Sequence, residues 1–231
     1  MSSDAKADRA RPWASLIAFA LVLVLAFALL RAVQTRLWGY WFGSTDLQET
    51  LPFALFLLGS FMVLSVGFVG GGVVRLTRTP WRALGWRREG AVKAIAWGLL
   101  GFVGTCVNVL VWNLVGGATS RPDYISPSAG RLLVVTFFAF GVAAWVEENL
   151  FRGYLQPLLA RRLPLPVAIT AQAAVFSVAH IGYTTSPIVF GSAFVSGVIL
   201  GALRGRDRSL VAPYVAHGLL WMMALFGPAP T

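Results

Sequence analysis

Acidic residues and cysteine are both scarce in this sequence. Its 231 residues include nine Asp and Glu against 19 Lys and Arg, and a single cysteine, Cys106. One cysteine excludes an intramolecular disulfide and a cysteine-based metal cluster. Charged residues make up only 12% of the chain, about half the share usual in soluble domains, whereas 57% is hydrophobic. This composition indicates a polytopic membrane protein and excludes an ordinary soluble enzyme.

The apolar residues are gathered in seven runs. A helix needs about 20 mainly apolar residues to cross the hydrocarbon core of a bilayer. The runs cover residues 14–34, 51–74, 91–116, 131–159, 164–184, 187–203 and 209–226. The first is longer than the apolar part of a secretory signal and no small-residue cleavage site follows it, so we expect it to be retained. The sequence therefore predicts an all-α fold, a polytopic membrane bundle of about seven transmembrane helices.

The excess of basic residues lies in short loops between these runs. Three basic segments, residues 75–88, 161–162 and 204–208, fall on the side of the N-terminus if the helices alternate. The opposite loops, 35–50 and 117–130, contain fewer bases and more acids. By the positive-inside rule the N-terminus is cytoplasmic and the C-terminus outside. The charge of +10 thus reflects topology and anionic lipid headgroups, not nucleic-acid binding, and we expect an integral protein of a bacterial cytoplasmic membrane.

Two carboxylates and an arginine interrupt the fourth apolar run. A charge at mid-membrane costs roughly 2.5–3.5 kcal/mol, so such residues usually face a bundle interior and have a function. Glu148 and Arg152 are four residues apart and share a helix face in the favourable order, which predicts a structural ion pair. Glu147 points away from Arg152 and has no cation in its own helix. It suits a general base or acid; the alternative is a protonated carboxyl used for packing.

Both histidines of the chain, His180 and His217, also lie in apolar runs. Glu147 is about 15 residues before the turn at Arg162 and His180 is 18 after it, so at 1.5 Å per residue they reach similar depths. His217 fits this level if the last helix starts deeper in the membrane. Three helices can therefore gather one carboxylate and two imidazoles. Such a set can activate water for hydrolysis, or it can bind zinc.

These residues resemble the motifs of the CPBP family, which includes the CAAX prenyl endopeptidases and bacteriocin-processing or immunity proteins. The matching residues are Glu147-Glu148-x-x-x-Arg152, Phe176-x-x-x-His180 and the later His217, each in its own apolar run. The resemblance implies an intramembrane endopeptidase with four catalytic core helices in residues 131–226. Residues 1–130 would supply three further helices and a cytoplasmic tail. The signature motifs of zinc, rhomboid-type and presenilin-like membrane proteases are absent.

The resemblance also implies a role for each residue. Glu147 would activate water, His180 would assist with the same water, and His217 would stabilise the oxyanion. Glu148, Arg152 and Phe176 would support the site. The family's glutamate mechanism needs no metal; with a metal, the ligands would be Glu147, His180 and His217, and the ion zinc. The expected partners are the lipid bilayer and a peptide or protein substrate, possibly prenylated.

One position departs from the family pattern. An Asn usually follows the last His by four residues, and here that residue is Trp221. An indole N–H donates but does not accept, so Trp221 can still donate to an oxyanion. Asn108, Asn113 or Asn149 are alternative donors, and a weakened protease is a third possibility. The rival function is a non-catalytic membrane protein, for immunity, scaffolding or proton-coupled transport, that uses the same Glu/His cluster.

Overall fold

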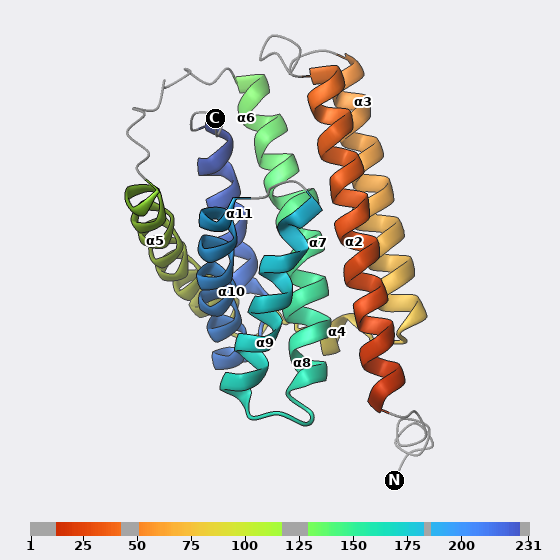
Figure 1. Ribbon diagram of the computed structural model, residues 1–231, viewed down its shortest axis with the longest axis vertical. Helices are drawn as coiled ribbons and strands as arrows, with labels where there is room; N and C mark the ends of the chain where they lie inside the picture. The colour runs from red at the N-terminus through yellow and green to blue at the C-terminus, as the bar shows by residue number, and fades with distance from the viewer. Residues whose placement is uncertain (1–12, 43–50, 117–128, 183–185, 227–231) are drawn as a thin grey trace.

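The computed structural model describes residues 13–42, 51–116, 129–182 and 186–226, and within these ranges every regular element is helical (Figure 1). The N-terminal elements are α2 (Trp13–Phe42), α3 (Leu51–Ser60), which continues as η2 (Phe61–Leu76), the short α4 (Trp81–Leu84) and α5 (Ala91–Val115). The next elements form one long helix: α6 (Ala129–Thr136), η3 (Phe137–Ala144), α7 (Trp145–Glu147), η4 (Glu148–Leu155) and α8 (Gln156–Leu159). Then follow α9 (Leu165–Val178), its 3-10 extension η5 (Ala179–Gly182), α10 (Pro187–Asp207) and α11 (Val211–Phe226).

The predicted all-α class is confirmed. Within the described residues, four helices are long and apolar enough to span a membrane: Leu55–Leu76, Ala91–Val115, Leu132–Leu159 and Pro187–Asp207. Three further apolar helices are shorter: Ile17–Val33, Leu165–Ile181 and Val211–Met223. These helices coincide with the seven apolar runs, although a total of seven membrane spans stays a prediction.

One helix end was predicted wrongly. The first apolar run ends at residue 34, but α2 continues to Phe42. The polar residues Thr35 and Arg36 close the apolar run without closing the helix, because arginine is a good helix former and no proline or glycine follows directly. Arg31 therefore lies well inside a 30-residue helix and not at its end.

The long helix that carries the two glutamates changes its winding around them. Its segments η3 and η4 are π-helical, and the short α-helical α7 between them ends at Glu147. π-Helical turns are rare and occur frequently at functional sites. The regular α-helix assumed from the sequence is therefore wrong in this stretch, yet Glu148 and Arg152 still meet across one turn.

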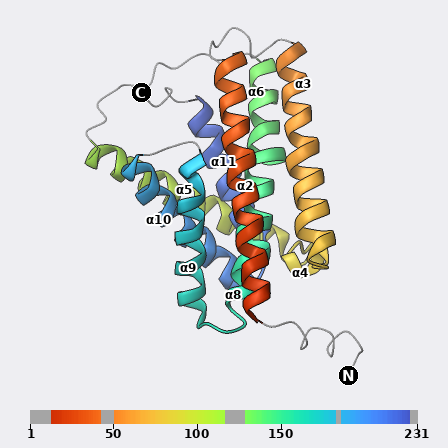
Figure 2. The same cartoon turned by 45° about the vertical axis from the view of Figure 1, so that its right-hand side comes forward.

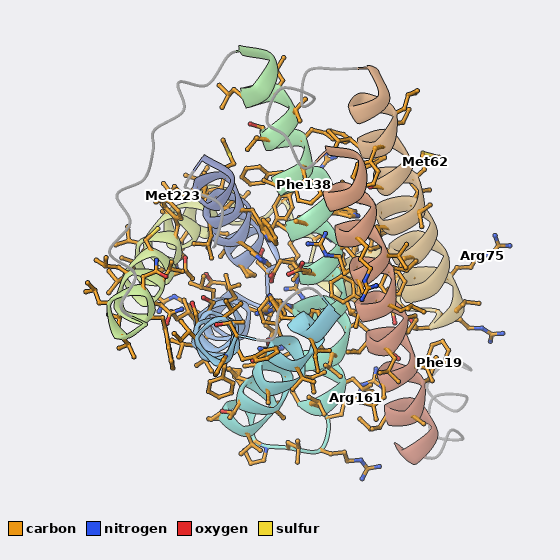
Figure 3. The ribbon with its side chains drawn as sticks, turned by 45° about the horizontal axis from the view of Figure 1, so that its top comes forward. Phe19, Met62, Arg75, Phe138, Arg161 and Met223 are labelled. Atoms are coloured by element: carbon orange, nitrogen blue, oxygen red, sulfur yellow. The ribbon has the colours of Figure 1, made fainter. Side chains whose placement is uncertain are left out.

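The bundle is apolar outside, and its mainly apolar core also contains a set of buried polar residues. Large apolar side chains such as Leu25, Met62 and Val92 are exposed, and Figure 3 shows Met62 pointing away from the helices. Seven described polar or charged residues are at most 2% exposed: Thr105, Glu147, Glu148, Asn149, Arg152, Gln156 and Gln172. This pattern suits a protein surrounded by lipid, in which polar groups must find partners inside the bundle.

Small residues let α10 approach α9 closely. A side chain added at Gly197 would come 2.9 Å from the Cβ of Ala173, and one at Gly201 would come 2.8 Å from Nε2 of Gln172. The Gln172 amide donates to the backbone oxygen of Gly197 at 2.9 Å, and Gln156 of α8 donates to that of Gly201 at 2.9 Å. Hydrogen bonds of this kind replace a hydrophobic driving force between membrane helices.

The helices alternate in direction, so that α2 begins at the end of the bundle where the α8–α9 turn and the end of α10 lie (Figures 1 and 2). Basic side chains project at this end: Figure 3 shows Arg161 at the α8–α9 turn and Arg75 at the end of η2. Helix α9 ends part-way along the longer helices, and its extension η5 packs against α2. His180 is thereby held at an intermediate depth.

Candidate active site

Three helices bring the predicted site residues together inside the bundle. Glu147 and Glu148 come from α7 and η4, His180 from η5, and His217 from α11. Their exposed fractions are 1%, 0%, 9% and 4%. Helix α11 begins at Val211. His217 reaches the other site residues, as expected if this last helix starts deeper in the membrane.

Glu148 is the anchor of the cluster. Its Oε1 accepts a hydrogen bond from Nη1 of Arg152 at 2.8 Å and a second from Nδ1 of His217 at 2.6 Å. The ion pair with Arg152, predicted from the four-residue spacing, is present. The bond to His217 joins η4 to α11 and was not predicted. Glu148 therefore orients the imidazole as well as balancing the charge of the arginine.

The two ring nitrogens of His217 have different partners. Since Nδ1 faces a carboxylate, it carries the proton, and Nε2 accepts from the indole N–H of Trp221 at 3.1 Å. The same Nε2 lies 3.5 Å from Oε2 of Glu147. In this arrangement the N–H of Trp221, at the position of the usual Asn, is engaged with His217.

Glu147 is buried without a hydrogen bond to either carboxylate oxygen in the described part of the chain. Besides His217, its close charged neighbour is Arg31, whose Nε lies 4.0 Å from Oε1. Arg31 is 4% exposed and was not predicted as a site residue. The signal for it was present, because an ionisable residue within an apolar run is a functional candidate by default.

Phe176 is the apolar centre around which the polar groups are arranged. Its ring lies 4.7 Å from the ring of His180 and 5.9 Å from that of His217, both in edge-to-face geometry. The guanidinium of Arg152 lies 4.2 Å from the same ring. The spacing of Phe176 and His180 in the motif, one helical turn, thus places their two rings in contact.

His180 is oriented by its own helix. Its Nδ1 lies 2.8 Å from the backbone oxygen of Phe176, so that nitrogen carries the proton and donates. The lone pair of Nε2 then faces away from this bond. Glu147 and Arg31 lie within electrostatic range of the ring. The similar depth expected for Glu147 and His180 agrees with this proximity.

The three asparagines considered as oxyanion donors are placed elsewhere. Asn149 donates to the backbone oxygen of Trp145 at 2.7 Å and accepts from the indole of Trp86 at 2.8 Å. Asn108 ties α5 to α10 by donating to Ser196 at 2.9 Å. Asn113 is exposed on α5. Among the described residues these amides form no hydrogen bond with the Glu/His cluster, whereas the indole of Trp221 donates to His217.

The donor set is a poor fit for zinc. Among the described residues no group of three or more His, Cys, Asp or Glu side chains is placed to hold a metal ion. A histidine ligand binds through a free lone pair, and that of His217 Nε2 is used by Trp221. The absence of a metal requirement stays a prediction.

Comparison with known proteins agrees with the motifs. Residues 129–223 match the family model described as type II CAAX prenyl endopeptidase Rce1-like. No curated protein and no solved structure matches the chain. The matched region contains Glu147, His180, His217 and Trp221, but it excludes Arg31. The family that residues 129–223 match is the one that the order and spacing of the motifs predict.

Proposed function

We propose that the protein is an intramembrane endopeptidase that hydrolyses a peptide bond near the membrane face with water activated by Glu147. The observation that carries this proposal is the buried carboxylate of Glu147, which lies 3.5 Å from His217 and 4.0 Å from Arg31 without a hydrogen bond of its own. A buried polar group without a partner is costly. A water or a substrate group bound there removes that cost.

Glu147 and His180 would both contact the attacking water molecule, in different roles. Glu147 takes a proton from the water while the water oxygen attacks the peptide carbonyl. Glu147 then returns that proton to the leaving amine when the C–N bond breaks. His180, protonated on Nδ1 by its bond to Phe176, offers the lone pair of Nε2 to the same water. The guanidinium of Arg31, 4.0 Å from Oε1 of Glu147, lies beside this carboxylate.

His217 and Trp221 would form the oxyanion site together. When Nε2 of His217 has taken up a proton from bulk solvent before the reaction, the ring donates there, and Glu148, 2.6 Å from Nδ1, stabilises the cation. The indole N–H of Trp221, 3.1 Å from Nε2, then loses its acceptor and becomes available. Two neighbouring N–H donors would face the developing negative charge, which is the arrangement that stabilises tetrahedral intermediates.

We further propose that all seven apolar helices cross the membrane, with the N-terminus cytoplasmic and the C-terminus outside, in a bacterial cytoplasmic membrane. The alternating helix directions and the basic side chains at one end of the bundle support this topology (Figures 1 and 3). The substrate would be a peptide or protein that reaches the site at the membrane face. A prenylated C-terminal peptide is the first substrate class to test.

The decisive experiment is peptide cleavage by the purified protein. Wild type, Glu147→Gln and the control Glu89→Gln, whose carboxylate is exposed, are reconstituted in lipid nanodiscs with quenched fluorescent peptides, prenylated and unprenylated. Loss of a catalytic base typically lowers the rate by about 10²–10⁴-fold, so Glu147→Gln should be nearly inactive and Glu89→Gln normal. Equal rates in all three proteins would contradict the proposal and favour the non-catalytic alternative. A metal chelator tests the zinc alternative, since metal-free chemistry leaves the rate unchanged.

A further inference from the structure

Arg204 is a buried cation at the basic end of the bundle. It lies in the last turn of α10 and is 7% exposed. Its Nε donates to the backbone oxygen of Arg152 at 3.1 Å, one turn from the glutamate pair. In the described part of the chain, this is the only hydrogen bond made by its guanidinium. Its terminal nitrogens therefore remain available to a further acceptor.

Gly85 forms the floor on which this guanidinium lies. A Cβ added there would come 2.8 Å from Cζ of Arg204 and 2.9 Å from each terminal nitrogen. Gly85 has a left-handed backbone, with φ of 108°, and its carbonyl accepts from the amide of Leu210 at 2.9 Å. The loop after α4 thus lies against one side of the guanidinium at the end of α10.

The charges around Arg204 have the same sign as its own. Arg87 and Arg208 are exposed and lie close enough to repel it. Among the described residues, no carboxylate forms an ion pair with Arg204. A buried charge without a counter-ion costs several kcal/mol, so this arrangement calls for an anion that the chain does not supply.

We propose that Arg204, Arg87 and Arg208 bind a phosphate group, supplied by the headgroup of an anionic phospholipid. A guanidinium matches phosphate oxygens in pairs, and its planar fork makes it the preferred residue for such sites. The site is three residues from the end of α10, at the end of the bundle where Arg161 and Arg75 project (Figure 3). In the topology proposed above, lipid phosphates would lie at this level of the membrane, so the headgroup is the source that the location favours.

The site is connected to the Glu/His cluster through the backbone. The Nε bond of Arg204 holds the carbonyl of Arg152, whose side chain binds Glu148. A phosphate that fixes Arg204 would therefore also brace the helical turn that carries this ion pair. The inference concerns binding, and it holds whether or not the protein cleaves peptides.

The test measures lipid retention by native mass spectrometry. Wild type, Arg87→Gln/Arg208→Gln and the matched control Arg161→Gln/Arg162→Gln are purified from membranes containing phosphatidylcholine and phosphatidylglycerol. The control removes the same charge from exposed residues at the same end of the bundle. Wild type and the control should retain one phosphatidylglycerol, and the Arg87/Arg208 variant should retain at least tenfold less. Equal retention in all three, or equal loss in both variants, would overturn the inference.

A second measurement separates lipid from soluble phosphate. The thermal unfolding midpoint of wild type in neutral detergent is followed during titration with phosphatidylglycerol or with inorganic phosphate. We expect a rise with the lipid at concentrations where inorganic phosphate has no effect, and no rise for Arg87→Gln/Arg208→Gln. An equal rise with inorganic phosphate would make the ligand a soluble phosphate and overturn the lipid assignment. A rise that is unchanged in the variant would overturn the site itself.

Discussion

Nε of Arg31 lies 4.0 Å from Oε1 of Glu147, although the two residues belong to helices on opposite sides of the boundary of the family match. Both side chains are almost fully buried. At this distance and burial, the interaction between opposite charges is screened little by water. The N-terminal helix α2 therefore contributes directly to the electrostatics of the proposed base.

Arg31→Gln should lower kcat by about 10²-fold, a loss of the size seen when one charge-stabilising group is removed from an active site. Arg31→Lys, which keeps the charge, should keep part of the activity. Arg36→Gln, in the same helix but exposed, is the control. Steady-state cleavage of the same peptide by wild type and the three variants gives the comparison, and a normal kcat for Arg31→Gln would refute this role.

Trp221→Phe should lower kcat by about 10²–10³-fold, because it removes one oxyanion donor. The phenyl ring keeps the edge-to-face contact with Phe138, whose centroid lies 5.9 Å from that of Trp221, so the fold should persist. Trp221→Asn, which restores the amide usual in the family, should be active. Steady-state kinetics on the same peptide separates kcat from KM. If Trp221→Phe matches wild type, the indole N–H has no part in catalysis.

Glu148→Gln should destabilise the protein by about 3–5 kcal/mol, because it leaves Arg152 buried without its counter-ion. It also weakens the bond that orients His217. Glu147→Gln is the matched control, since Glu147 has no hydrogen bond among the described residues. Unfolding followed by tryptophan fluorescence in detergent compares the two variants. If the two variants are equally stable, Glu148 contributes no more to stability than Glu147, and the prediction is wrong.

Gly85→Ala should lower stability and abolish retention of phosphatidylglycerol. The added methyl group collides with the guanidinium of Arg204, and the left-handed backbone is strained for alanine. Together these effects should cost at least about 1–3 kcal/mol. Gly90→Ala shares the positive φ but meets no atom within 4 Å, so it isolates the backbone strain. Unfolding and lipid mass spectrometry on both variants provide the check; equal lipid retention would contradict the role of Gly85 as the floor of the site.

Local spacing was sufficient to predict the ion pair of the site. The four-residue separation of Glu148 and Arg152 fixes their common helix face, and the pair survives the change to π-helical winding. The similar depth of Glu147 and His180 was also predictable in outline, because the depth of a residue in a helix follows from counting residues, whereas His217 fitted that count only if its helix starts deeper in the membrane. Both predictions depend only on distances along a helix, which follow from the spacing of residues in the sequence.

Contacts between helices were beyond the reach of the sequence. The bond from His217 to Glu148, the position of Trp221 on the same imidazole, and the approach of Arg31 to Glu147 all depend on how each helix is rotated and tilted against its neighbours. Those angles are set by packing over the whole bundle. Arg31 was missed for a further reason: the apolar run ended soon after it, although the helix did not.

Because α2 contributes Arg31, the proposed active site extends beyond the residues that carry the family motifs. A fragment limited to residues 129–223 would contain every recognisable motif residue, yet it would lack the guanidinium beside Glu147 and the helix against which η5 packs. Its central carboxylate would then meet hydrocarbon. Under the proposed mechanism, the motif residues alone would therefore not be sufficient for activity. Exchange of N-terminal helices between relatives would preserve activity only if the new helix places a cation at the same depth.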